Sequence, residues 1–162
     1  MSFQSRLTVV GIFALMLNAA TASAQLPNPY GAAVNGDNAK KAAAAALAEA
    51  RKNNWTMAVA IVDPAGDLVY FEKLDNTQAA STLIAIDKAR SSVRFKRATK
   101  VMMDQLAAGG DGLRFLALQG AIPVEGGVPL LMDGKIVGAV GISGGTSQQD
   151  GQAAAAGAAA VK

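Results

Sequence analysis

The sequence predicts an α+β domain built on an antiparallel sheet. Two pairs of strand-like segments are each joined by a tight turn, Asp63-Pro-Ala-Gly66 in the first pair and Asp133-Gly134 in the second. Segments with helical character precede, separate and follow these pairs. Strands that pair as hairpins, with helices gathered between them, favour an antiparallel sheet with helices on its faces. With one further candidate strand, we expect about five strands.

The first expected helix is rich in alanine. Asp37 or Asn38 can cap it, and it extends to about Lys52. Alanine favours helix but offers little apolar area, so this helix is expected to lie against a broad surface.

The first hairpin follows this helix. Apolar and small residues alternate over residues 55–62, which is typical of a strand. Pro64 sets its own φ and Gly66 permits a positive φ, so a turn is expected there. Residues 67–74 then return as the partner strand.

The remainder of the chain is predicted as two helices, further strands and a last helix. Gly109-Gly110 is a helix stop, and Asp133-Gly134 favours a type I′ turn. The expected ranges are 79–95 and 99–108 for the helices, 115–121 for a strand, 123–145 for the second hairpin, and 147–161 for the last helix, which Ser147 caps.

The N-terminus has the pattern of a secretory signal. Arg6 precedes the apolar residues 7–17, and Ala22-Ser-Ala24 is a small-x-small cleavage site. Cleavage after Ala24 predicts an exported protein, periplasmic or secreted, with no membrane span afterwards. The expected organisation is a signal peptide at 1–24, a flexible linker at 25–36, and one domain at 37–162.

Composition excludes several classes of function. The net charge of the full chain is only +3, so no basic field indicates nucleic-acid binding. The chain has no cysteine and no histidine. Disulfides, thiolate metal sites, the Ser-His-Asp triad and histidine-ligated zinc or haem are therefore excluded.

The second hairpin is rich in glycine near its ends. Glycine lets another molecule approach the backbone, so these residues predict a binding edge. The same pattern also fits simple turn geometry. The residues are Gly126, Gly127, Gly141, Gly144 and Gly145.

Basic residues are densest over residues 88–100. Arg90, Arg94 and Arg97 have the spacing of one helix face. Such a face can bind carboxylates through charge-assisted hydrogen bonds, or it can be an ordinary solvated surface. The complete set is Lys88, Arg90, Arg94, Lys96, Arg97 and Lys100.

Several segments carry a resemblance to a known family. They occur in order through nearly the whole domain and are similar to the GlcG/HbpS family, also described as a haem-degrading domain. The matching segments are Ala60-Ile-Val-Asp-Pro-Ala-Gly-Asp-Leu68, Lys88-Ala89, Gly126-Gly-Val-Pro129, Gly138-Ala-Val-Gly-Ile-Ser-Gly144, and Asp150 with Ala156-Gly157.

The resemblance implies a profilin-like fold, assembly into homo-oligomers, and haem as a cofactor. It implies that Thr99 contacts haem, and its pattern includes a lysine followed by alanine, here Lys88-Ala89, which could turn toward the glycine-rich hairpin. Lys88 could bind an anion or act as a catalytic base or nucleophile. The structural alternatives are an ion pair with Asp63, Asp75 or Asp87 for Lys88 and a helix N-cap for Thr99.

Other residues could complete a ligand site. Phe95 could stack on a flat ligand, or it could be part of the core. Gly126, Gly127 and Pro129 could line a pocket between subunits. Phenolate or thioether groups could bind haem iron, although methionine is more often core. The candidates are Tyr70, Met57, Met102, Met103 and Met132.

Three functions follow from these patterns. The first is an exported protein that binds haem or a similar anionic planar ligand. The alternative is an enzyme acting on a hydroxy or oxo acid, with Lys88 as the base and the Gly126 and Gly127 amides stabilising negative charge. The third is an assembly or scavenger module whose pocket is vestigial, which a filled space beside Gly127 would support.

Overall fold

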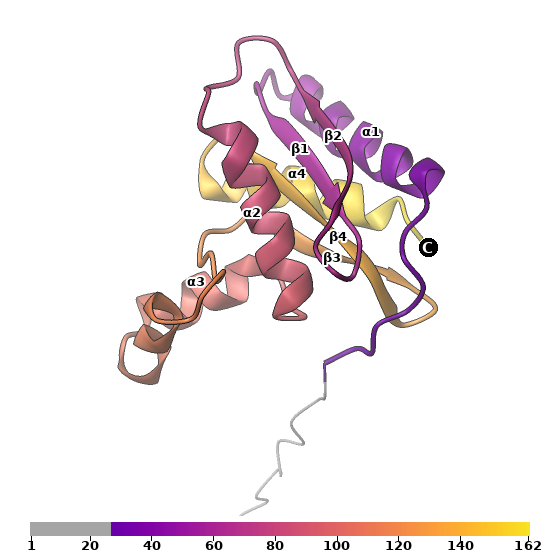
Figure 1. The fold of residues 1–162 in the computed structure, drawn as a ribbon. Coiled ribbons are helices and arrows are strands. Elements are labelled where there is room, and N and C mark those ends of the chain that lie inside the picture. The colour runs from indigo at the N-terminus through magenta and orange to yellow at the C-terminus, as the bar shows by residue number, and fades with distance from the viewer. Residues whose placement is uncertain (1–26) are drawn as a thin grey trace, which may run out of the picture.

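The computed structural model describes residues 27–162, which form a four-stranded antiparallel sheet with helices on both faces (Figure 1). The strand order is β2-β1-β4-β3, so the two hairpins lie side by side and β1 pairs with β4. The strands are β1 Ala58–Val62, β2 Leu68–Lys73, β3 Gly127–Met132 and β4 Lys135–Ser143; the helices are α1 Gly36–Lys52, α2 Ser81–Arg94, α3 Thr99–Ala107, the 3-10 helix η1 Gly110–Leu116 and α4 Ser147–Ala159.

Helices α1 and α4 cover one face of the sheet, and α2 covers the other (Figure 1). Val59 and Ile61 pack into the α1–α4 core, whereas Ala58 and Ala60 pack beneath α2. This is the alternation of large and small residues expected for β1. The large side chains fill the layer between the sheet and helices α1 and α4. The small side chains let α2 approach the sheet.

The approach of α2 is closest over β4. Gly141 is buried, and a Cβ atom there would overlap the backbone carbonyl oxygen of Ala85. Only glycine permits this contact, because the helix backbone lies directly on the strand. The close contact brings the Lys88 region of α2 to the end of β4.

The prediction of a strand at 115–121 is wrong. Residues 110–116 form η1, and residues 117–126 contain no strand, so the sheet has four strands instead of five. Gly112 packs against the backbone of Gln105 so tightly that a Cβ atom would overlap its carbonyl oxygen. The segment therefore folds back on α3 and does not reach the edge of the sheet. The description of the fold as profilin-like stays a prediction.

The N-caps of two helices lie one to three residues before the expected positions. Asn35, not Asp37 or Asn38, caps α1, and its side chain accepts a hydrogen bond from the Asn38 N–H at 2.9 Å. Thr146, not Ser147, caps α4, where it forms a capping box with Gln149. The predicted type I′ turn agrees with the positive φ of 48° at Asp133 and 71° at Gly134.

Residues 28–34 are attached to the sheet and are not the free linker that we expected. The Gly31 N–H donates to the Ile136 carbonyl and the Val34 N–H donates to the Val137 carbonyl, each at 2.8 Å. The Tyr30 hydroxyl donates to the carbonyl of Val93 at 2.9 Å. The segment thus pairs with the start of β4, on the same side of β4 as β1. The predicted signal peptide lies outside the described residues.

Candidate functional site

Lys88 is buried where α2 crosses the end of β4. Its side chain is 1% exposed, and Nζ lies 2.7 Å from Oδ2 of Asp150. Nζ also donates to the carbonyl oxygen of Ile142 at 3.1 Å. The ammonium group therefore has an opposite charge and a second acceptor within the protein, as a buried charge requires.

The partner of Lys88 was not among the three carboxylates that we considered. Asp63, Asp75 and Asp87 all lie near α2 in sequence, whereas Asp150 comes from α4, 62 residues after Lys88. Asp150 was visible in the sequence only as part of the family resemblance. A pairing across that distance depends on the packing of α2 and α4 around β4, which no local pattern contains.

Asp150 accepts hydrogen bonds in addition to the ion pair. Its Oδ1 accepts from the backbone N–H of Gly145 at 3.0 Å. Burial raises the pKa of Asp150 above its ordinary value, and the Lys88 ammonium and the amides of Gly144 and Gly145 act in the opposite direction. The pair thus joins α2, α4 and the end of β4 in the interior.

Thr99 and Gly127 meet beside this ion pair. Thr99 is fully buried at the start of α3, and its Oγ1 accepts a hydrogen bond from the Gly127 N–H at 2.9 Å. The N-cap of α3 is Ala98, so the hydroxyl does not cap its own helix. Instead, it satisfies a backbone donor at the start of β3.

The space beside Gly126 and Gly127 is filled by the protein itself. A Cβ atom on Gly127 would overlap the Lys88 carbonyl and lie 2.7 Å from Cγ2 of Thr99. A Cβ atom on Gly126 would lie 2.9 Å from Nζ of Lys88. The predicted meeting of Lys88, Thr99 and these two glycines is therefore found, but as close packing rather than as an open binding edge.

Phe95 and Pro129 lie away from this cluster. Phe95 is half-buried at the C-terminal end of α2, and its carbonyl accepts from Nε of Arg97 at 3.0 Å. Pro129 lies opposite Ala139 on the edge strand β3. A proline suits an edge strand because it cannot donate to a neighbouring strand.

The basic residues of 88–100 do not form one shared face. Helix α2 ends at Arg94, and Lys96 has a positive φ of 54°, so Arg97 lies beyond the helix and not on the face of Arg90 and Arg94. Lys96 lies 4.2 Å above the ring of Tyr30. Lys100 pairs with Asp104 at 2.8 Å. Most of these cations are thus engaged with groups of the same chain.

Arg90 and Arg94 differ because they line an open cavity. The cavity has a volume of about 220 Å³ and lies between α2 and the segment that precedes β3. Nε of Arg90 donates to the carbonyl of Gly66 at 3.0 Å, which fixes that side chain. Neither arginine forms a salt bridge with a described residue. The lining residues are Asp87, Arg90, Arg94, Gly120 and Ile122.

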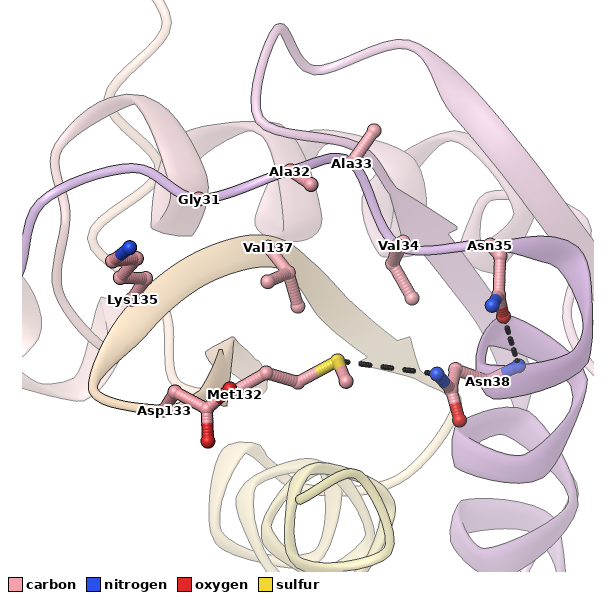
Figure 2. A pocket seen from close by; sticks show the side chains of 10 residues that line it. All are labelled: Gly31, Ala32, Ala33, Val34, Asn35, Asn38, Met132, Asp133, Lys135 and Val137. Carbon is pink, nitrogen blue, oxygen red and sulfur yellow. Dashed lines mark hydrogen bonds between the residues drawn. The ribbon is translucent and has the colours of Figure 1, made fainter.

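A larger cavity lies between the N-terminal segment and the β3–β4 hairpin. Its volume is about 360 Å³, and Figure 2 shows Met132 crossing it toward Asn38, whose Nδ2 donates to the thioether sulfur at 3.9 Å. Lys135 and Asp133 bring one charge of each sign. The cavity contains one of the candidate haem ligands, Met132, but none of the other predicted site residues, and its charges do not select for an anion.

The described residues contain no cluster of acidic side chains able to hold a metal ion. Among the helices of residues 27–162, none is sufficiently long and apolar to cross a bilayer.

Comparison with known proteins agrees with this architecture. The family model for haem degrading protein HbpS-like matches residues 34–159. The chain belongs to this family. The curated protein GlcG of Escherichia coli strain K12 is 37% identical over 100 residues, which cover 62% of this chain and 73% of GlcG.

Similar solved structures include a haem complex and HbpS. The PduOC:heme complex superposes with a TM-score of 0.72 at 27% identity and covers 80% of this chain and 96% of PduOC. HbpS superposes with a TM-score of 0.73 at 28% identity and covers 82% of this chain and 92% of HbpS. The antiparallel α+β fold is thus shared with these proteins.

Sequence reasoning identified Arg90 and Arg94 but missed the other side of their cavity. Gly120 was placed within the expected strand at 115–121 and Ile122 directly after it, but that strand does not form. The i, i+3, i+7 spacing of Asp87, Arg90 and Arg94 was the available signal, because it places all three on one face of a helix.

Proposed function

We propose that this protein is an exported haem-binding protein in which Arg90 and Arg94 bind the propionate groups. Family membership and the resemblance to the haem complex of PduOC support haem as the ligand. The observation that supports the assignment of the site is the cavity lined by two guanidinium groups that form no salt bridge with a described carboxylate.

Charge and hydrogen-bonding geometry support carboxylates as the groups bound. A guanidinium group presents paired N–H donors that match the two oxygens of a carboxylate. Arg90 is held by Gly66 through Nε and keeps its terminal N–H groups for a ligand. Asp87 repels an anion from its own end of the cavity, which favours a carboxylate position nearer Arg94.

The size of the cavity limits what it can enclose. Cavities that enclose drug-sized ligands usually have volumes of about 300–1,000 Å³, and this one has only about 220 Å³. It accommodates the carboxylate end of haem and leaves the ring outside. Ile122 in the lining and the exposed Leu118 and Val124 on the same segment offer apolar surface for the ring.

Iron ligation contributes little in this proposal. The chain contains no histidine or cysteine, and the Thr99 hydroxyl is buried and bonded to Gly127. Met57 and Met102 are also fully buried. The Tyr70 hydroxyl donates to Glu72 at 2.9 Å. Met132 lines the larger cavity of Figure 2, which Arg90 and Arg94 do not line. In this proposal affinity comes from the propionates and from ring contacts.

A set of porphyrin titrations tests this proposal. Haem and metal-free protoporphyrin IX should bind with affinities within about tenfold of one another, whereas haem dimethyl ester should bind far more weakly because its propionates carry no charge. Replacing both arginines (R90A/R94A) should weaken haem binding at least about 100-fold, since each of the two charge-assisted hydrogen bonds contributes about 1.5–3 kcal/mol. Soret absorbance and tryptophan fluorescence report binding.

Arg51→Ala is the matched control, because Arg51 is an exposed arginine on α1 that pairs with Glu72 at 3.2 Å. It should leave haem affinity unchanged. Equal binding of haem and its dimethyl ester, or full affinity in the R90A/R94A variant, would show that the propionates are held elsewhere or not at all.

The enzyme alternative has no supporting observation in this structure. Lys88 is 1% exposed and bound to Asp150, so a hydroxy or oxo acid cannot reach its amine without displacing the ion pair. A catalytic base must lie within hydrogen-bonding distance of the proton that it removes.

A further inference from the structure

The turn between β1 and β2, residues 63–67, contacts both arginines of the open cavity. Nε of Arg90 donates to the carbonyl oxygen of Gly66 at 3.0 Å. A Cβ atom on the same glycine would lie 3.0 Å from Nε and 3.2 Å from Nη2 of Arg94. One residue of this turn therefore lies against both guanidinium groups.

Gly66 is buried, although it lies in a hairpin turn. Its neighbours Ala65 and Asp67 are exposed, as turn residues ordinarily are. The burial of Gly66 agrees with the contacts that Arg90 and Arg94 of α2 make with it. Its φ of 92° is one that residues with a side chain rarely adopt. Both the backbone and the space beside it therefore favour glycine at this position.

Hydrogen bonds within the turn hold Gly66 in place. Oδ1 of Asp63 accepts from the N–H groups of Ala65 and Asp67, each at 2.9 Å. The Gly66 N–H donates to the Asp63 carbonyl at 3.0 Å. The Asp63 carboxylate is thus used by the turn itself, and within residues 27–162 it forms no salt bridge. The carbonyl that holds Arg90 therefore has a fixed position before any ligand binds.

The segment that carries Gly120 and Ile122 is also attached to α2. The N–H of Ile122 donates to Oγ of the buried Ser91 at 2.9 Å. A Cβ atom on Gly120 would lie 4.0 Å from Nη1 of Arg94, which is an ordinary contact distance. The guanidinium of Arg94 thus has Nε and Nη2 beside the β1–β2 turn and Nη1 nearer to Gly120, with both of these segments bonded to α2.

We propose that Gly66 is the positioning residue of this site and that its lack of a side chain keeps Arg94 available to a carboxylate of the ligand. The inference rests on the proposed binding of carboxylates by Arg90 and Arg94. The Gly66 carbonyl holds Arg90, and its bare Cα leaves room for the guanidinium of Arg94. A carboxylate side chain at position 66 would begin beside Arg94 and would pair with it from within the protein. The residue at position 66 therefore determines whether Arg94 has an internal partner.

Gly66→Asp tests the proposal, because aspartate tolerates a positive φ better than most residues and would place a carboxylate beside Arg94. The new ion pair should weaken haem binding by about tenfold or more, which corresponds to the loss of one charge-assisted hydrogen bond. Gly134→Asp is the matched control. Gly134 lies in the β3–β4 turn with a φ of 71°, and apart from its chain neighbours a Cβ atom there would meet no described atom within 4 Å. The control makes the same change in charge at a positive φ and should leave haem affinity unchanged.

A neutral variant separates the effect of charge from that of size. Gly66→Asn has almost the same shape as Gly66→Asp but no charge, and asparagine also tolerates a positive φ. Its haem affinity should lie between those of the wild type and Gly66→Asp. Urea unfolding shows which variants are folded. Wild-type haem affinity in whichever Gly66 variant is folded, or an equal loss of affinity in Gly134→Asp, would overturn the proposal.

A measurement without haem separates this proposal from the proposed function. The Nε–H signal of Arg94 in proton–nitrogen NMR should shift in Gly66→Asp but not in Gly134→Asp, since only the first variant puts a carboxylate beside that group. This shift, together with a wild-type protein that does not bind haem, would support the contact of Arg94 with Gly66 and overturn only the proposed function. An unshifted signal in Gly66→Asp would overturn the positioning role of Gly66 even if the wild type binds haem.

Discussion

Helix α2 carries two cationic regions that differ completely in environment. Lys88 points into the protein and pairs with Asp150, whereas Arg90 and Arg94 line a cavity that is open to solvent. Arg90 lies only two positions after Lys88 in the sequence. The difference follows from the helical period, because two residues turn the side chain by about 200° around the axis.

The comparison shows that charge alone does not indicate a ligand site. Lys88 belongs to a segment that carries the family resemblance, yet its charge is paired with the protein's own Asp150. Only helical spacing indicated a binding role for the two arginines, yet their guanidinium groups keep N–H donors that a ligand can use. A charged group is available to a ligand only where the fold leaves it without an internal partner.

The largest expected effect comes from breaking the buried pair. Lys88→Met should destabilise the fold by about 3–5 kcal/mol, because it leaves Asp150 buried without its cation. Urea unfolding followed by tryptophan fluorescence measures the change. Lys100→Met, which breaks an exposed pair with Asp104, is the control and should change stability far less. Equal effects in the two variants would contradict the distinction between the buried and exposed cations.

A smaller effect is expected at Thr99. Thr99→Val keeps the side-chain shape but removes the acceptor for the Gly127 N–H, so a buried donor loses its partner. Stability should fall by about 1–3 kcal/mol. Chemical denaturation reports the free energy, and hydrogen exchange at Gly127 should accelerate. A fully stable variant would mean that the hydroxyl has no structural role.

The smallest effect on stability is expected at the open cavity. Arg94→Ala should change the free energy of unfolding by no more than about 0.5 kcal/mol, because no hydrogen bond or salt bridge from its side chain to a described residue is lost. Denaturant midpoints of this variant and of the wild type provide the measurement. A loss comparable with that of Thr99→Val would indicate a structural arginine rather than one kept for binding.

Local patterns in the sequence determined most of the secondary structure. Alternating residue size placed β1, Asp133-Gly134 placed the β3–β4 turn, and the glycines at 109 and 110 placed the end of α3. These signals are local because they depend on backbone preference and on the period of each element. The apolar run at 115–121 failed as a signal, since a strand also needs a neighbour and the close contact of Gly112 with Gln105 directs the chain elsewhere.

What the sequence by itself determined is the α+β class, the two hairpins, and the absence of histidine and cysteine chemistry. Only the tertiary structure decided which cation is buried, because the Lys88–Asp150 pair joins residues that meet through the packing of α2 and α4 around β4. It also decided that the glycines of the second hairpin accommodate the protein's own backbone and side chains. Residue type determines which interactions a side chain can make. The neighbours that folding places around it determine which of those interactions remain available to a ligand.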